Sequence, residues 1–154
     1  MNLVDELYAI TTALHAAKIP YAVCGGIAVA AYGAPRHTKD IDIVIGPENV
    51  AAALEAVRPL GYAFPALPMT FEAETERERH VQRVSKLDGK QHLTLDFLLA
   101  EAAYARALDE SVNVALPKGP ITFVSKATLV AMKRLAARPL DLVDVERLEA
   151  DEDA

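Results

Sequence analysis

Two aspartates one residue apart, Asp40 and Asp42, lie inside an otherwise apolar run, DIDIVI. Isoleucines alternate with them, which is typical of a strand, so both carboxylates are predicted to point to one face. Carboxylates held close together repel each other unless a cation lies between them, and Mg²⁺ prefers such oxygen ligands. The pair therefore indicates a metal site; the alternative is a strand face that is simply exposed to solvent.

A third acid, Asp96, lies in a second apolar run, HLTLDFLL, on the opposite alternation from Leu95 and Phe97. We infer that this strand is a neighbour of the strand with Asp40 and Asp42. Three carboxylates at one patch could hold two metal ions for an in-line phosphoryl or nucleotidyl displacement.

A pair of glycines, Gly25 and Gly26, follows a short apolar run and precedes an alanine-rich segment. Glycines permit close approach of the backbone to a ligand, and a following helix offers free N–H groups to phosphate. Arg36 and Lys39 flank the acidic pair and could contact phosphate oxygens. The alternatives are an ordinary tight turn for the glycines and solvation at the surface for the two cations.

The elements that must position these residues follow from periodicity and from turn residues. Asp88-Gly89-Lys90 predicts a hairpin between two of the strands. We expect an α+β (mixed α/β) fold with a mixed sheet flanked by helices and with C-terminal helices, in one domain over residues 1–150 before an acidic tail at 151–154. The predicted helices are 2–17, 27–32, 48–57, 101–108, 125–137 and 139–149, and the predicted strands are 21–24, 40–45, 62–64, 79–87, 92–99, 112–116 and 121–124.

The composition narrows the class of protein. With 154 residues, 52% hydrophobic and 25% charged, the chain is typical of soluble globular proteins. Its net charge of −6 argues against a protein that mainly coats nucleic acid. It contains neither a membrane-spanning apolar run nor a signal peptide, so we expect a cytoplasmic protein. Cys24 is its single cysteine and is interpreted as a small buried apolar residue.

The charged stretch EAETERERHVQRVSK, residues 72–86, mixes both signs of charge. It predicts a solvated charged face. The alternative is a basic face that guides an RNA acceptor. Its members would be Arg77, Arg79, Arg83 and Lys86.

In order and type, these residues resemble the nucleotidyltransferase superfamily that shares the polymerase-β-type core. The matching pattern is G-G-x-A, a short helix, and then R-x-T-x-D-I-D-I, with Asp96 at the place of the family's third acid. The segment SKATLVAMKRLAARPLDLVDVERL resembles the AbiEii-type toxin branch, although Leu140 departs from that branch's frequent lysine. The matching positions are Gly25, Gly26, Ala28, Arg36, Thr38, Asp40, Ile41, Asp42, Ile43 and Asp96, and then Lys133, Arg138, Pro139, Asp141 and Asp144.

The resemblance implies an enzyme that moves a nucleoside monophosphate from a nucleoside triphosphate to an acceptor hydroxyl. Asp40, Asp42 and Asp96 would be catalytic and would ligate Mg²⁺, with two ions expected. Lys133 would contact the nucleotide and Asp141 would orient that lysine. The full set of expected nucleotide-binding residues is Gly25, Gly26, Arg36, Thr38, Lys133 and Asp141.

The branch implies RNA, and tRNA above all, as the acceptor, and an antitoxin protein as a partner. Two alternatives stay open. One is the same chemistry on a small molecule such as an aminoglycoside. The other is a degenerate domain that binds a nucleotide or a partner protein without turnover. The C-terminal residues also have plainer interpretations, because Lys133 could extend to solvent and Asp141 could favour a helix N-terminus.

Overall fold

A computed structural model of the chain describes residues 2–34 and 38–150, so the predicted acidic tail lies outside the described residues. The helices are α1 (Leu3–Ala16), α2 (Gly25–Ala31), α3 (Val50–Val57), α4 (Lys126–Ala136) and α5 (Pro139–Ala150), with short 3-10 turns at Pro47–Asn49, Arg58–Leu60 and Ala102–Tyr104. The strands are β1 (Tyr21–Cys24), β2 (Asp40–Ile45), β3 (Tyr62–Pro65), β4 (Met69–Phe71), β5 (Arg79–Asp88), β6 (Gln91–Leu99), β7 (Val112–Val114) and β8 (Ile121–Phe123).

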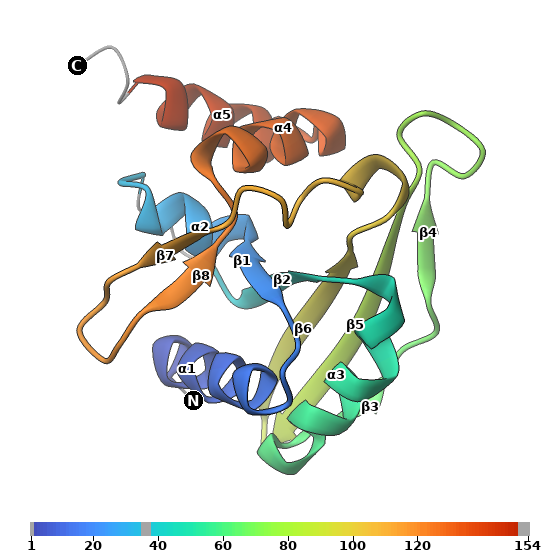
Figure 1. The fold of residues 1–154 in the computed structure, drawn as a ribbon, viewed down its shortest axis with the longest axis vertical. Helices are drawn as coiled ribbons and strands as arrows, with labels where there is room; N and C mark the ends of the chain where they lie inside the picture. Colours follow the sequence, from blue (N-terminus) through green and yellow to red (C-terminus); the bar gives the residue numbers. More distant parts are fainter. Residues whose placement is uncertain (1, 35–37, 151–154) are drawn as a thin grey trace.

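The strands form one mixed sheet of eight strands in the described part of the chain. Its order is β3-β5-β6-β2-β1-β8-β7, and β4 also pairs with β5. The pairs β2–β6 and β1–β8 are parallel and the others are antiparallel. Figure 1 shows helices packed around this sheet, with α4 and α5 together at one end of the molecule and α1 and α3 away from them. The predicted α+β fold is confirmed.

Local sequence explains where the first helix begins and which side it buries. The Asn2 side chain accepts hydrogen bonds from the N–H groups of Val4 and Asp5, and so caps α1. Apolar residues at helical spacing, Leu7, Ile10 and Leu14 among them, are buried in the core.

The centre of the sheet buries the side of β2 that carries no acid. Ile41, Ile43 and Ile45 are fully buried, as are Leu95 and Phe97 on the neighbouring β6. Residues of α1 and α3 belong to the same core cluster. Because side chains alternate along a strand, the acids of β2 and β6 then lie on the opposite face.

Three local predictions were wrong. The helix predicted from residue 27 begins at Gly25, so Gly25 and Gly26 form the first turn of α2. The helix predicted over 101–108 is reduced to the 3-10 turn at Ala102–Tyr104, which starts from a left-handed residue, Ala102 at φ +50°. The segment after β3, where no helix or strand was predicted, contains β4, because pairing with β5 imposes a strand that the short sequence of this segment does not indicate.

Among the described residues, no helix combines the length and the apolar character that crossing a bilayer requires.

Candidate active site

The sheet brings the three acids to one patch. β2 and β6 lie parallel with Asp42 directly opposite Asp96, and Asp40 lies two residues earlier on the same face of β2. The predicted pairing of these strands is therefore confirmed. All three carboxylates line a cavity of about 430 Å³, together with Cys24, Gly25, Gly26, Thr38 and residues of β4, β5, α4 and α5.

Asp42 is the most perturbed of the three acids. Burial, followed by the nearby charges of Asp96 and Asp40, raises the pKa of Asp42 to about 7 from an ordinary value of 3.8. Lys133 and Arg138 oppose that rise through their positive charges. A cation bound at this carboxylate would offset both the desolvation and the repulsion.

Gly25 packs directly against Asp42. Its φ is +68°, in the left-handed region that favours glycine, and a Cβ at this position would overlap the carboxylate of Asp42. The first glycine of the pair is therefore required both by backbone conformation and by close contact. Cys24, just before it, is buried as predicted, and burial raises the pKa of its thiol.

Asp96 is paired with a residue that was not among the predicted site residues, Arg83. Arg83 on β5 lies opposite Asp96 in the sheet and donates from Nε to Oδ1 at 2.8 Å and from Nη2 to Oδ2 at 3.0 Å. This bidentate geometry holds both carboxylate oxygens and fixes the plane of the guanidinium. The Asp96 side chain is 14% exposed and the Arg83 side chain is 45% exposed.

The C-terminal helices contribute a buried ion-pair cluster. Lys133 of α4 lies 3.2 Å from Oδ1 of Asp141 and 3.1 Å from Oδ2 of Asp144, both on α5. All three side chains are at most 8% exposed. Lys133 therefore lines the cavity without extending to solvent, and its ammonium is held by two acids.

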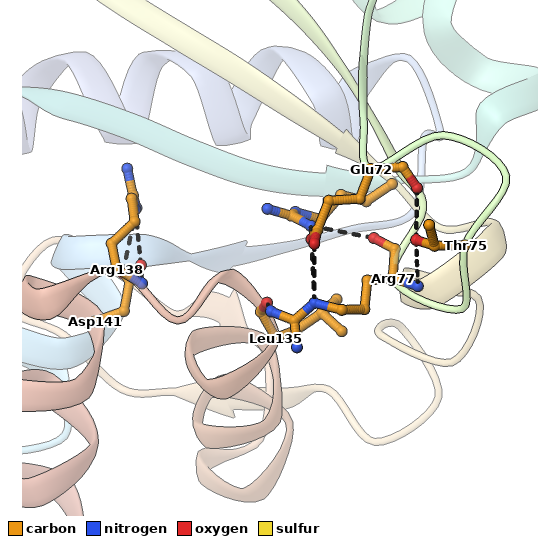
Figure 2. A network of polar contacts seen from close by, with 7 residues as sticks. Glu72, Thr75, Arg77, Leu135, Arg138 and Asp141 are labelled. Carbon is orange, nitrogen blue, oxygen red and sulfur yellow. Dashed lines mark hydrogen bonds and ion pairs between the residues drawn. The ribbon is translucent and has the colours of Figure 1, made fainter.

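Arg138, in the short connection between α4 and α5, also contacts Asp141 (Figure 2). Its Nε donates to Oδ2 of Asp141 at 2.7 Å. Burial by itself raises the pKa of Asp141, but the hydrogen bond from Arg138 and the charge of Lys133 together lower it below its ordinary value. Asp141 is thus held ionised between two cations.

The other predicted nucleotide-binding residues have different outcomes. Gly26 and Thr38 line the cavity, and the hydroxyl of Thr38 donates to the carbonyl oxygen of Asp40 at 3.4 Å. Arg36 lies outside the described residues. Within residues 2–34 and 38–150, no group of three or more His, Cys, Asp or Glu side chains is arranged to hold a metal ion.

The cations of the charged stretch do not form one solvated face, so that prediction was wrong. Arg79 and Arg83 line the cavity, whereas Lys86 contacts Glu6 at 2.8 Å. Arg77 donates to the carbonyl oxygen of Leu135 near the end of α4, as Figure 2 shows. The alternation of a strand separates these side chains, because Arg79 and Arg83 share a face that Lys86 does not.

One signal in the sequence could have placed Arg83 beside Asp96. The turn at Gly89 and Lys90 makes Asp88 the partner of Gln91, and counting back along the antiparallel pair leads to Arg83 opposite Asp96. Other cavity residues had no such signal, because they come from segments without periodicity or from distant elements. They include Met69, Phe71 and Tyr104.

No protein-family model and no curated protein sequence matches the chain. Among solved structures, it is similar to the lincosamide antibiotic adenylyltransferase LnuA with lincomycin bound, at 16% sequence identity and a TM-score of 0.55 over 94% of this chain and 95% of that one. It is similar to ANT(2'')-Ia in complex with adenylyl-2''-tobramycin, at 17% identity and a TM-score of 0.58 over 98% of this chain and 89% of that one.

A candidate nucleotidyltransferase from Thermotoga maritima is similar at 16% identity, with a TM-score of 0.56 over 97% of this chain and 90% of that one. At such identities the likeness concerns the arrangement of helices and strands. Together with the acids gathered on β2 and β6, these comparisons show that the chain has the fold of nucleotidyltransferases.

Proposed function

We propose that this protein is a metal-dependent nucleotidyltransferase that moves a nucleoside monophosphate from a nucleoside triphosphate to an acceptor hydroxyl. The observation that carries the proposal is that Asp40, Asp42 and Asp96 lie together on one face of the sheet. Beside them is Gly25, where any side chain would overlap the carboxylate of Asp42. The fold of the solved nucleotidyltransferases supports it. We place the reaction in the cytoplasm, where nucleoside triphosphates and Mg²⁺ are both abundant.

The donor set fits a divalent cation. Asp40 and Asp42 offer the oxygen ligands that Mg²⁺ prefers, and Asp42 lies where burial and like charges disfavour its ionised form unless a cation is near. These two residues would hold the metal. Asp96 as a third ligand, and a second ion, stay predictions, because Arg83 holds both oxygens of Asp96.

Bound Mg²⁺ would supply charge neutralisation to the triphosphate. The residues of the chain would do the positioning. The backbone at Gly25 and Gly26 would approach the phosphates closely, and Arg138, of which the side chain is 75% exposed, would offer its remaining N–H groups to them. Lys133 would act through charge, since its ammonium is held by Asp141 and Asp144.

The proposed reaction needs only the nucleoside triphosphate and the acceptor hydroxyl. The acceptor oxygen forms a bond to the α-phosphorus, and the bond from that phosphorus to the bridging oxygen of the β-phosphate breaks. Pyrophosphate leaves with the electron pair, and the hydroxyl proton passes to a carboxylate, for which Asp96 is our candidate. Catalysis then rests mainly on positioning and on charge stabilisation.

The acceptor is the finer part of the proposal. The toxin interpretation, with RNA or tRNA as the acceptor and an antitoxin as a partner, is supported only by the resemblance of the C-terminal segment. A small-molecule acceptor is favoured by the fold neighbours, which include adenylyltransferases solved with lincomycin and with adenylyl-2''-tobramycin.

The test is transfer of label from each α-labelled nucleoside triphosphate, with Mg²⁺, to total RNA and to pooled small metabolites. Asp42→Asn should reduce transfer roughly a hundredfold or more, because it removes a charged ligand of the metal. Asp109→Asn makes the same change at an exposed position outside the cavity and should leave transfer unchanged.

A second readout is independent of the acceptor. Wild type should gain thermal stability from a nucleoside triphosphate only when Mg²⁺ is present, and Asp42→Asn should not. Absence of both transfer and this Mg²⁺-dependent stabilisation would refute the proposal and leave a degenerate binding domain.

A further inference from the structure

A part of the cavity lies beyond the acids, and the proposed function assigns it no role in binding the nucleotide. In the sheet, Met69 pairs with Val81, Val81 with Leu98, and Arg83 with Asp96. Directly paired residues share a face, so this surface continues the face that carries the three acids. We call it the acceptor face, and its residues are Met69, Phe71, Arg79, Val81, Arg83 and Leu98.

The position of the acceptor face follows from the chemistry. The triphosphate is proposed to lie between the acids and the residues of α2, α4 and α5. An attacking hydroxyl has to reach the α-phosphorus from another side, and β4, β5 and β6 form that side of the cavity. Arg83 lies at the border, because it contacts Asp96 while extending from β5.

The charges of the cavity oppose a polycationic acceptor. Four carboxylates line it, and two of them are already paired: Asp96 with Arg83, and Asp141 with Lys133 and Arg138. The other two, Asp40 and Asp42, are the proposed metal ligands. No cavity-lining carboxylate of the described residues is then left to receive an ammonium group.

The acceptor face combines the guanidinium of Arg83 with neighbouring apolar side chains. Arg83 is held by two hydrogen bonds from Nε and Nη2 to Asp96, and within residues 2–34 and 38–150 its Nη1 makes no hydrogen bond. A guanidinium fixed in this way is preorganised to bind a carboxylate or phosphate oxygen. Four apolar side chains lie beside it on the same face: Met69, Phe71, Val81 and Leu98. Arg79 lies on this face too, over the ring of Phe71, but its charge is already paired with Glu72 at 2.6 Å.

The walls of the cavity favour a small acceptor. The loop between β4 and β5 is tied to α4, because Arg77 donates to the carbonyl oxygen of Leu135 (Figure 2). Glu72 at the base of that loop holds Arg77 at 3.1 Å and Arg79 at 2.6 Å. These contacts join β4, β5 and α4, which all line the cavity, and its volume of about 430 Å³ is that of small-molecule sites.

We propose, on the basis of the proposed function, that the acceptor face binds a small hydroxyl compound with an apolar body and one anionic group, and that Arg83 binds the anion. Arg83 is then the residue that determines the acceptor class: it admits carboxylates, phosphates or sulfonates and repels ammonium groups. The proposal excludes polyamine-like antibiotics and RNA ends as acceptors.

The first test uses two probes that share a ring and differ in charge, naphthalene-1-sulfonate and 1-naphthylmethylammonium. Their binding is measured by NMR with and without saturating Mg²⁺ and ATP, so that binding in the nucleotide site can be recognised. In the presence of ATP the sulfonate should bind at least roughly fivefold more tightly than the ammonium. Equal binding of the two probes would overturn the proposal.

Variants assign the discrimination to Arg83. Arg83→Gln should abolish the preference for the sulfonate, Arg83→Lys should retain part of it, and Phe71→Ala should weaken both probes alike. Arg58→Gln, at an exposed arginine away from this cavity, is the matched control. Unchanged sulfonate binding in a folded Arg83→Gln variant would refute the role of Arg83. Equal sulfonate binding by Arg83→Lys and Arg83→Gln would refute it as well.

The second test separates this proposal from the proposed function. Labelled products from pooled metabolites are sorted by the charge of the acceptor on ion exchangers, with tobramycin and total RNA added as separate reactions. Label on small anionic acceptors supports the proposal, whereas label on tobramycin, on other cations or on RNA overturns it. No transfer to any acceptor, with the probe preference intact, refutes the transferase and supports the acceptor face as an anion-binding site.

Discussion

At the scale of single residues, Asp42 shows a conflict between stability and the proposed chemistry. The unfolded chain releases the proton of this carboxyl near pH 3.8, whereas the folded protein holds it until about pH 7. Between these values the folded state binds more protons than the unfolded state, so the free energy of unfolding falls as pH rises. Above about pH 7 the full cost of the buried charge is present.

Asp42→Asn should therefore be more stable than wild type in the absence of metal. We expect a gain of about 2 kcal/mol in the free energy of unfolding at pH 8, since a buried like-charged carboxylate is removed, and a gain that shrinks toward pH 4. Urea denaturation at several pH values measures it. Asp40→Asn, at an exposed position, should show a smaller gain, and a pH-independent difference for Asp42→Asn would contradict the prediction.

At the scale of elements, α4 and α5 are joined by two neighbouring ion pairs with opposite surroundings. Lys133 is buried with Asp141 and Asp144, whereas Arg134 meets Glu149 at the surface with both side chains about half exposed. A buried charge that loses its partner is left unpaired in a medium of low dielectric constant, whereas an exposed charge is solvated by water. The two pairs provide an internal comparison on the same helices.

Lys133→Met should lower the free energy of unfolding by about 3–5 kcal/mol, because it leaves two buried carboxylates without that ammonium. Arg134→Met should change it by less than about 1 kcal/mol. Chemical denaturation of both variants at pH 7 decides the matter. Similar losses for the two variants would show that Lys133 is not held as the structure describes.

At the scale of the whole molecule, the proposed site lies at the centre of the sheet. β2 and β6 carry the acids on one face and the core residues Ile43 and Phe97 on the other. Each of these two strands pairs with a neighbour on both sides. In contrast, β7 lies at an edge of the sheet, and β4 pairs only with β5 among the described strands. The acids are thus fixed by the most protected part of the fold, and the acceptor face extends toward its less protected margin.

Amide hydrogen exchange should report this gradient. The amides of Ile43 and Phe97 should exchange only through global unfolding, whereas those of β4 and β7 should exchange roughly a hundredfold faster or more. Exchange followed by NMR gives the rates, and their denaturant dependence separates global from local opening. Equal protection in the centre and at the margins would contradict it.

Much of the fold could be predicted from the chain because its signals are local. Strand alternation located β2 and β6, the Asp88-Gly89 turn located the β5–β6 hairpin, and helical periodicity located α1 and α4. β4 and the short turn at 102–104 could not be predicted in this way, since tertiary pairing and not propensity decides them.

The sequence by itself determined that Asp40 and Asp42 share a face, that Asp96 lies in a strand, and that a pair of glycines directly follows the strand at 21–24. These properties depend on the period of two along a strand and on the conformational freedom of glycine. The tertiary structure alone decided that β2 lies beside β6, that Lys133 is enclosed by Asp141 and Asp144, and that Arg83 and the acceptor face border the acids. Such neighbours are set by which distant elements pack together, and no local periodicity encodes that choice.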